Sequence, residues 1–184
     1  MFYGCSGLTG NVPEFGSMLT EGSDMFSGCT NIDGTLPAKL SDSLIRGVSM
    51  FNGLSKLTGN VPELPDSLEN GQNMFRSCSG LDGTLPAKLP ENLTDGFWMF
   101  ADCSKLTGNV PEFGSKITVG QYMFSSCKNL TGNIPILPDS LTNGTGLFNN
   151  CSGLTGTIPE LPSALENGSS MFNGCSGLTG NVPE

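Results

Sequence analysis

Seven cysteines are the most reactive side chains of this chain, and they share one position of a recurring pattern. They are Cys5, Cys29, Cys78, Cys103, Cys127, Cys151 and Cys175. A nucleophilic or metal-binding cysteine needs a base or further ligands nearby, yet the chain has no histidine and no Cys-x-x-Cys pair. Leu54 takes the same position once, so the site accepts an apolar side chain. We expect buried, reduced cysteines that act as small hydrophobic residues, with disulfide bonds between neighbouring repeats as the alternative.

Carboxylates form a second recurring position. It holds Glu14, Glu63, Glu112, Glu160 and Glu184, and it is interrupted by Ala38, Ala87 and Ile136. Acid-base catalysis needs carboxylates that converge in a pocket, whereas one repeated position predicts a row along a surface. We expect a solvated row of like charge, with weak calcium capture as the alternative. The sequence therefore predicts no catalytic residue, no cofactor and no metal site, and a protein that is not an enzyme.

Short polar side chains occupy two further positions, and together they form the candidate binding surface, which we call the polar face. Its residues are Thr9, Asn11, Asp33, Thr35, Thr58, Asn60, Asp82, Thr84, Thr107, Asn109, Thr131, Asn133, Thr155, Thr157, Thr179 and Asn181. In one interpretation these side chains hydrogen-bond to one another along the array and keep it soluble. In the other, a regular lattice of hydroxyl and amide groups binds glycan, protein or even ice.

The element that positions these residues is a repeat of 24 or 25 residues. Units beginning with Met-Phe, or once Leu-Phe, start at residues 1, 25, 50, 74, 99, 123 and 147, and a half unit covers residues 171–184. The second and fourth units are one residue longer because Ala-Lys replaces a single Glu, which predicts a loop there. Such short units cannot enclose a core alone, so their apolar side chains must stack. We therefore predict that residues 1–184 form one repeat solenoid.

The spacing inside each unit predicts its local structure. Phe2, Cys5 and Leu8 are three residues apart, which favours a short 3₁₀ or α-like turn with these side chains on one side. The stretch LTGNV alternates apolar or small residues with polar ones, as a half-buried strand does, and the following proline ends it. The Asn-Gly pairs at Asn70, Asn143 and Asn167 are predicted to supply a turn before the next unit.

A glycine at the centre of the predicted strand recurs in all eight units, beginning with Gly10. The strand pattern places it on the inner side, where the phenylalanine row is expected to leave no room for a Cβ atom. A backbone bulge at this position is the alternative explanation.

The stretch LENGSSMFNGCSGLTG at residues 165–180, with its partial copies, resembles the BspA-like leucine-rich repeats of bacterial and protozoan surface proteins. LTGTIP at residues 154–159 is also similar to plant-type leucine-rich repeats. The resemblance implies a right-handed solenoid with short parallel β-strands on one face and short 3₁₀ or α turns and loops on the other. It also implies a protein at the cell surface or outside the cell, which functions in adhesion by binding protein or glycan.

Charge and hydropathy narrow the range of partners. The net charge is -9, and the eight Lys and Arg residues are scattered singly, which argues against binding to nucleic acid or to anionic membranes. No apolar run reaches the roughly 20 residues that span a bilayer, so we expect no direct membrane insertion.

The two ends of the sequence resemble its interior. CSGLTGNVPE occurs at residues 5–14 and again at residues 175–184, without the atypical capping repeats that usually close a solenoid. This predicts a segment of a longer array, or copies of the chain that stack end to end. The alternative function is accordingly that of a structural spacer or filament-forming protein.

Overall fold

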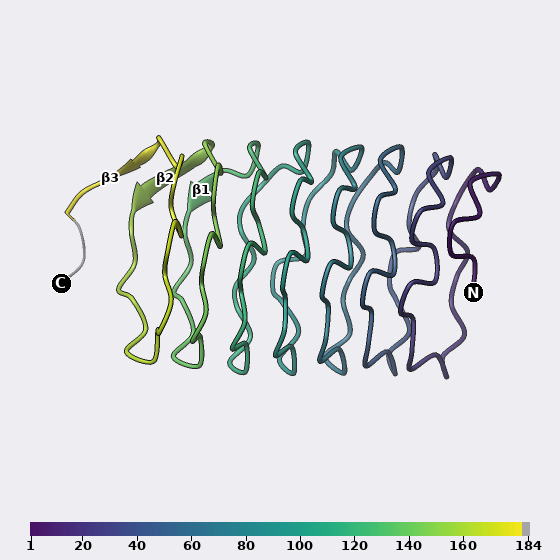
Figure 1. Ribbon diagram of the computed structural model, residues 1–184, viewed down its shortest axis with the longest axis horizontal. Coiled ribbons are helices and arrows are strands. Elements are labelled where there is room, and N and C mark those ends of the chain that lie inside the picture. Colours follow the sequence, from purple (N-terminus) through teal and green to yellow (C-terminus); the bar gives the residue numbers. More distant parts are fainter. Residues whose placement is uncertain (182–184) are drawn as a thin grey trace.

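The computed structural model describes residues 1–181 as a rod in which successive coils lie side by side along one axis (Figure 1). Backbone hydrogen bonds join each coil to the next, as from Phe2 N to Met25 O at 2.7 Å and from Phe148 N to Met171 O at 2.9 Å. Because these bonds link residues about one repeat apart, the repeat is also the structural unit. The predicted repeat solenoid is confirmed.

The regular strands lie in the LTGN stretches, as predicted. They are β1 (Gly132–Asn133), β2 (Leu154–Thr157) and β3 (Leu178–Thr179), which form one parallel sheet in the order β1-β2-β3 (Figure 1). Earlier units contribute isolated parallel bridges at the same place, such as Thr35 with Thr58. The pairing is staggered, because Gly132 pairs with Leu154, two residues before its equivalent Gly156.

A second parallel ladder lies on what we call the Met-Phe side, residues 21–28 and their equivalents. Its bridges run without interruption through Glu21, Arg46, Asn70, Asp95, Val119, Asn143 and Asn167. These residues are equivalent in successive units, so the pairing here is in register. The predicted turn at the Asn-Gly pairs is present, since Gln72 N donates to Asn70 Oδ1 and Met74 N to Gly71 O, each at 3.1 Å. The backbone of the same asparagines is also paired with the neighbouring coils, which the sequence analysis did not predict.

The turns of the Met-Phe side are β-turns, and residues 1–181 contain no helix. Met25 N donates to Gly22 O at 3.1 Å and Cys29 N to Phe26 O at 3.0 Å. The third residue of the first turn, Asp24, has a φ of 54°, as a type II turn requires. As predicted, residues three apart face one side, and Phe26, Cys29 and Ile32 are buried. The turns do not form a 3₁₀ or α helix, because the intervening amides leave the coil: Phe26 N donates to Met50 O of the next unit at 2.9 Å.

The core is a column of phenylalanine rings inside the rod. The rings of Phe2, Phe26, Phe51, Phe75, Phe100, Phe124, Phe148 and Phe172 stack on one another with centroids 5.2 to 6.0 Å apart. The preceding methionines pack beside them, and Met50, Met74, Met99 and Met123 are fully buried. The predicted phenylalanine row is thus confirmed, and its continuity explains how units of 24 residues share one core.

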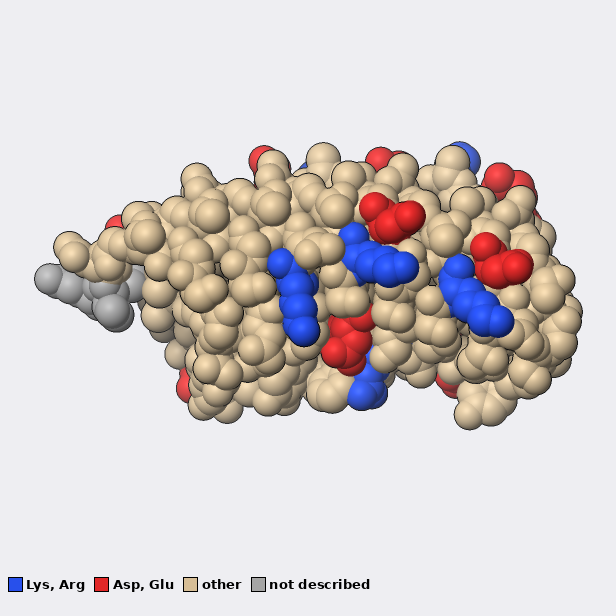
Figure 2. Space-filling view, turned by 90° about the horizontal axis from the view of Figure 1, so that it is seen from above, with Lys and Arg blue, Asp and Glu red and all other residues tan. Residues whose placement is uncertain are grey.

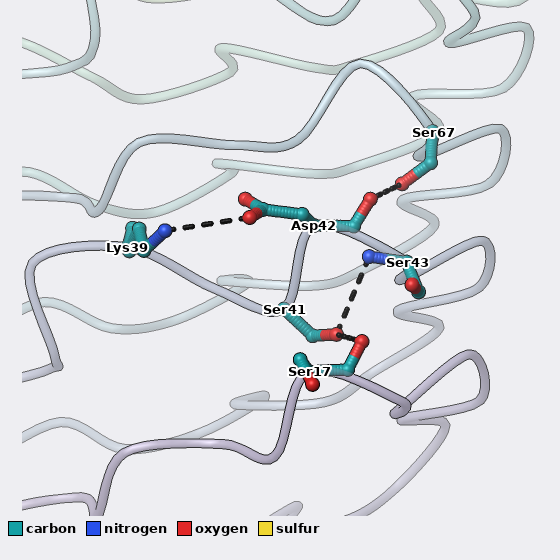
Figure 3. Close-up of polar contacts among 6 residues, drawn as sticks. All are labelled: Ser17, Lys39, Ser41, Asp42, Ser43 and Ser67. Atoms are coloured by element: carbon teal, nitrogen blue, oxygen red, sulfur yellow. Dashed lines mark hydrogen bonds and ion pairs between the residues drawn. The ribbon is translucent and has the colours of Figure 1, made fainter.

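The extra residue of the second unit lies in an exposed segment that still pairs with its neighbour. Lys39 forms a parallel bridge with Glu63, and its Nζ lies 3.4 Å from Asp42 Oδ2. Beside it, hydroxyl groups join three coils (Figure 3): Ser41 Oγ donates to the Ser17 carbonyl at 3.2 Å, and Ser67 Oγ to the Asp42 carbonyl at 2.9 Å. Serine side chains thus extend the bonding between coils where backbone pairing is sparse.

Candidate functional site

The polar face is an exposed surface along the rod. All sixteen of its residues are exposed, from Thr9 in the first unit to Asn181 in the eighth. The staggered strands and bridges of the LTGN stretches position them, because alternate residues of an extended segment point to opposite sides. The structure therefore places the whole predicted set on one side of the molecule.

The first two units are joined on this face by a reciprocal pair of side-chain bonds, which we call a clasp. Gly10 N donates to Asp33 Oδ1 at 2.8 Å, and Thr35 N donates to Asn11 Oδ1 at 2.9 Å. Each polar side chain thus accepts a backbone amide from the neighbouring coil. The clasp gives a hydrogen-bond acceptor to backbone amides that find none in the staggered backbone of the neighbouring coil.

The same clasp joins the third and fourth units. Gly59 N donates to Asp82 Oδ1 at 2.9 Å, and Thr84 N donates to Asn60 Oδ1 at 2.8 Å. It recurs because the second and fourth units carry Asp-Gly-Thr where the others carry Thr-Gly-Asn or Thr-Gly-Thr. The Asn and Asp side chains of these four units are therefore already engaged in holding the coils together.

The threonine hydroxyls of the polar face also bond to the preceding coil. Thr58, Thr107, Thr131 and Thr179 donate through Oγ1 to the carbonyls of Gly34, Gly83, Gly108 and Gly156, at 3.1 to 3.4 Å. These acceptors are backbone groups of the neighbouring coil. The structural interpretation of the sequence expected the side chains to bond to one another, which Thr35 and Thr84 do through Oγ1 with Asn11 and Asn60 at 3.4 Å. A large part of the polar face thus has a structural role.

Glycine is required at the recurring position for a different reason from the one predicted. A Cβ atom on Gly34 would collide with Asn11 Oδ1, and one on Gly108 would lie 3.3 Å from Thr84 Cγ2. In six of the units this glycine also has a φ between 77° and 89°, a conformation that L side chains disfavour. The predicted collision with the phenylalanine row is therefore wrong. The glycine leaves room for the Asn or Thr side chain of the preceding unit, and its φ agrees with the alternative of a local bulge.

Two adjoining depressions border the polar face and form what we call the polar groove. The first, of about 420 Å³, is lined by residues 35–38, 59–63 and 84–86. The second, of about 660 Å³, is lined by residues 85–87, 109–112 and 132–133. They share Leu85 and Pro86, so the groove crosses five successive units. Asparagines and threonines form one bank, and the glutamate position forms the other.

The charges around the groove are dispersed. Glu63 and Glu112 lie exposed along its bank. On the face shown in Figure 2, basic side chains lie apart from one another and several are next to acidic ones. The described ion pairs are Lys39 with Asp42, Arg46 with Glu21 and Lys88 with Glu91, at 3.4, 3.3 and 2.7 Å, and all of them are well exposed.

Six of the seven cysteines are buried, and all seven are unpaired. The Sγ of Cys78 donates to the Phe51 carbonyl of the preceding unit at 3.0 Å, and burial raises the pKa of this thiol to about 12. Such a thiol stays protonated near neutral pH and is a poor nucleophile. The predicted burial is confirmed for these six and wrong for Cys5, which is exposed.

The thiol bond recurs along the rod, and no pattern in the sequence predicted it. Cys29, Cys78, Cys103, Cys127, Cys151 and Cys175 each donate to the carbonyl of a phenylalanine, at 2.9 to 3.1 Å. Leu54 fills the same place in the third unit without this bond. The cysteine position therefore contributes both apolar packing and a weak hydrogen bond between coils.

An aromatic stack that sequence analysis did not find lies on the outer surface of the Met-Phe side. The Arg76 Cζ atom lies 3.6 Å from the centroid of the Trp98 ring, which contacts Tyr122 edge to face at 5.5 Å. Both aromatic residues have a φ of 54°, which is rare for large side chains. A Cβ atom on Gly146 would collide with the Tyr122 ring, so this glycine accommodates the stack. The signal in the sequence was Trp and Tyr at a position where other units carry Asp, Ser, Asn or Gly.

No group of three or more His, Cys, Asp or Glu side chains within residues 1–181 is arranged to hold a metal ion. The glutamate row, for which calcium was the alternative, lies spread along the rod. In the same part of the chain, no helix is long and apolar enough to cross a membrane.

Comparison with known proteins gives one match. Residues 49–179 match the family model described as the BspA type leucine rich repeat region, in six copies. No curated protein and no solved structure matches the chain. The matched region includes the second depression of the polar groove and the aromatic stack.

Proposed function

We propose, because the chain belongs to the family of BspA-type leucine-rich repeats, that it is a non-enzymatic interaction module at a cell surface or outside the cell. In this proposal it binds an extended protein segment or glycan chain along the polar groove. The observation that carries the proposal is the groove itself, which runs through successive units and is bordered by side chains of the same few types.

The second depression is the centre of the proposed site. Asn109 and Asn133 line it, and their side-chain amides form no hydrogen bond to the residues that the structure describes. In contrast, Asn11 and Asn60 already accept backbone amides. Unengaged amides beside a depression can donate to and accept from a polar ligand.

A repeated set of amide groups suits an extended ligand that presents polar groups at regular intervals. The carboxylate of Glu112 on the bank and the net charge of -9 favour a neutral or cationic ligand over an anionic one. The buried thiols, with raised pKa values, and the spread glutamates support a binding role in preference to catalysis.

The test is binding of the purified chain to an array of neutral oligosaccharides and to an array of 15-residue peptides. Asn109→Ala combined with Asn133→Ala removes two amides, and we expect about tenfold weaker binding to any probe held in the groove. The matched control is Asn52→Ala combined with Asn173→Ala on the Met-Phe side, which should bind as the wild type does.

Equal binding by both double variants would contradict a site in the groove. If no probe binds and light scattering shows rods that lengthen with concentration, the proposal of a structural spacer or filament replaces that of a binding module. Labelling of intact source cells with an antibody to the chain tests the proposed surface location.

A further inference from the structure

Ile136 is an exposed apolar residue at a position where the other units carry Glu or Ala. Its side chain is 87% exposed, whereas the next residue, Leu137, is buried at 3%. Pro135 and Pro138 flank the pair and restrict the backbone of this segment. The chain therefore holds Ile136 outward on a stiff segment in the sixth unit of the rod.

A pocket of about 700 Å³ lies beside Ile136, and we call it the acidic-rimmed pocket. It is lined by residues 135–139 of the sixth unit, by Glu112, Phe113 and Ser115 of the fifth unit, and by Glu91 of the fourth. Three successive units thus contribute walls. Its lining combines apolar side chains with three carboxylates, which the polar groove does not.

The fifth unit shapes this pocket because it carries Phe-Gly-Ser where four other units carry Leu-Pro followed by Asp, Glu or Ser. Phe113 packs edge to face on Phe124 and Phe148, with centroids 6.2 and 6.4 Å apart, so its ring is anchored in the core. A Cβ atom on Gly114 would collide with the Pro90 carbonyl, so only glycine permits this close approach. The first unit has the same Phe-Gly-Ser, but Ala38-Lys39 follows it in the next unit where Ile136 stands here.

The rim carries excess negative charge. Glu91 is paired with Lys88, whose Nζ lies 2.7 Å from Glu91 Oε1, and this lysine lowers the pKa of the carboxyl group. Lys116 Nζ donates to Asn92 Oδ1 at 2.7 Å. Within residues 1–181, Glu112 and Asp139 have no ion-pair partner. The pocket therefore offers apolar contact beside two carboxylates that form no ion pair with the described residues.

We propose that the acidic-rimmed pocket docks an extended segment of a partner protein. That segment inserts one aliphatic side chain against Ile136 and Phe113 and places a Lys or Arg beside it, next to Glu112 and Asp139. The apolar contact provides the anchor, and the opposite charges fix its orientation. This inference does not rest on the polar groove, although Glu112 lies at the edge of both.

The test is an NMR titration of the ¹⁵N-labelled full chain with the capped peptide Gly-Lys-Leu-Lys-Gly. We expect shift changes confined to the amides of residues 112–115, 136, 137 and 139, and weaker binding when salt is raised. Two control peptides, Gly-Glu-Leu-Glu-Gly and Gly-Lys-Gly-Lys-Gly, should each bind at least about tenfold more weakly.

Ile136→Glu is the decisive variant, because most other units carry Glu at this position and fold with it. It removes the apolar anchor while adding negative charge, so we expect about tenfold weaker binding if the anchor matters. Unchanged or stronger binding by Ile136→Glu would overturn the proposal, since charge alone would then suffice. Ala38→Glu, the same change in the second unit, should leave binding unchanged.

Two further outcomes also overturn the proposal. Shifts centred on Asn109 and Asn133 would place the peptide in the polar groove instead. Shifts of residues 136–139 that depend on protein concentration without peptide would show that a second copy of the chain covers Ile136. The double variant with Asn109→Ala and Asn133→Ala distinguishes binding in the polar groove from binding in the acidic-rimmed pocket. It should retain peptide binding in the acidic-rimmed pocket.

Discussion

The two sides of each coil join their neighbours in different ways. On the Met-Phe side the backbone pairs in register, and Gly22, Asp24, Phe26 and Gly28 each donate an amide to the next coil, at 2.8 to 3.0 Å. On the polar face the strands are short and staggered, and Asn, Asp and Thr side chains make many of the bonds between coils.

The comparison shows where the molecule has freedom to vary. A side held by backbone bonds tolerates different side chains at its half-buried positions, such as Trp98 and Tyr122, because the bonds do not depend on them. A side held by side-chain bonds has fewer groups left to bind a ligand. The unengaged Asn109 and Asn133 are therefore the most informative residues of the polar face.

Removing a ring from the core beneath the Met-Phe side should lower the stability most. Phe100→Ala removes a fully buried ring from the phenylalanine column and should lower the free energy of unfolding by about 3–5 kcal/mol, by lost contacts and a cavity. Urea unfolding followed by circular dichroism measures this. Phe97→Ala, at a half-buried external ring, is the control with a clearly smaller loss. Wild-type stability of Phe100→Ala would contradict the stacked core.

Changing the glycine of the polar face should have the next largest effect. Gly108 has a φ of 81°, and Thr84 Cγ2 approaches its Cβ position, so Gly108→Val should cost about 1–3 kcal/mol through backbone strain. Gly108→Asn should cost less, because asparagine tolerates this region better. The comparison is made by thermal unfolding. Equal losses for the two variants would argue against the conformational explanation.

Alkaline pH should reveal how much the buried thiols beside the Met-Phe side contribute to stability. Burial raises the pKa of Cys78 from 9.0 to about 12, so its stabilising effect is complete below pH 9 and is lost as the pH rises toward 12. Between pH 8 and pH 10 the unfolded thiol ionises and the folded one does not, which costs about 1.4 kcal/mol. Urea midpoints across this range should fall less steeply in Cys78→Leu, which imitates Leu54. If the urea midpoints of the wild type and of Cys78→Leu fall equally steeply with pH, the raised pKa does not belong to Cys78.

Removing one clasp should give the smallest effect. Asn60→Ala deletes the acceptor of the Thr84 amide and should cost about 1 kcal/mol. Asn133→Ala is the matched control in the same row, since its side chain accepts no hydrogen bond from the described residues, and its stability should stay close to that of the wild type. Chemical unfolding of the two variants side by side measures the difference. Indistinguishable losses would show that the clasps add little.

Much of the fold could be predicted from periodicity. A row of Phe at every 24 or 25 residues fixes a stack, and the chain confirms it from Phe2 to Phe172. The burial of most cysteines followed from Leu54 at the same position. The in-register ladder through Asn70 and its equivalents was missed, because Asn-Gly is also a strong turn signal and only the neighbouring coil reveals that its backbone is paired.

The sequence by itself determined which residues share a column and which side of the chain they face. Only the tertiary structure decided the stagger of the polar face and, with it, which asparagines are engaged. The physical reason is that side chains of an extended segment alternate with a period of two, so a shift of two residues leaves the inner and outer sides unchanged. Repeat patterns therefore cannot reveal such a shift, although it decides which side chains bond between coils and which are left for a ligand.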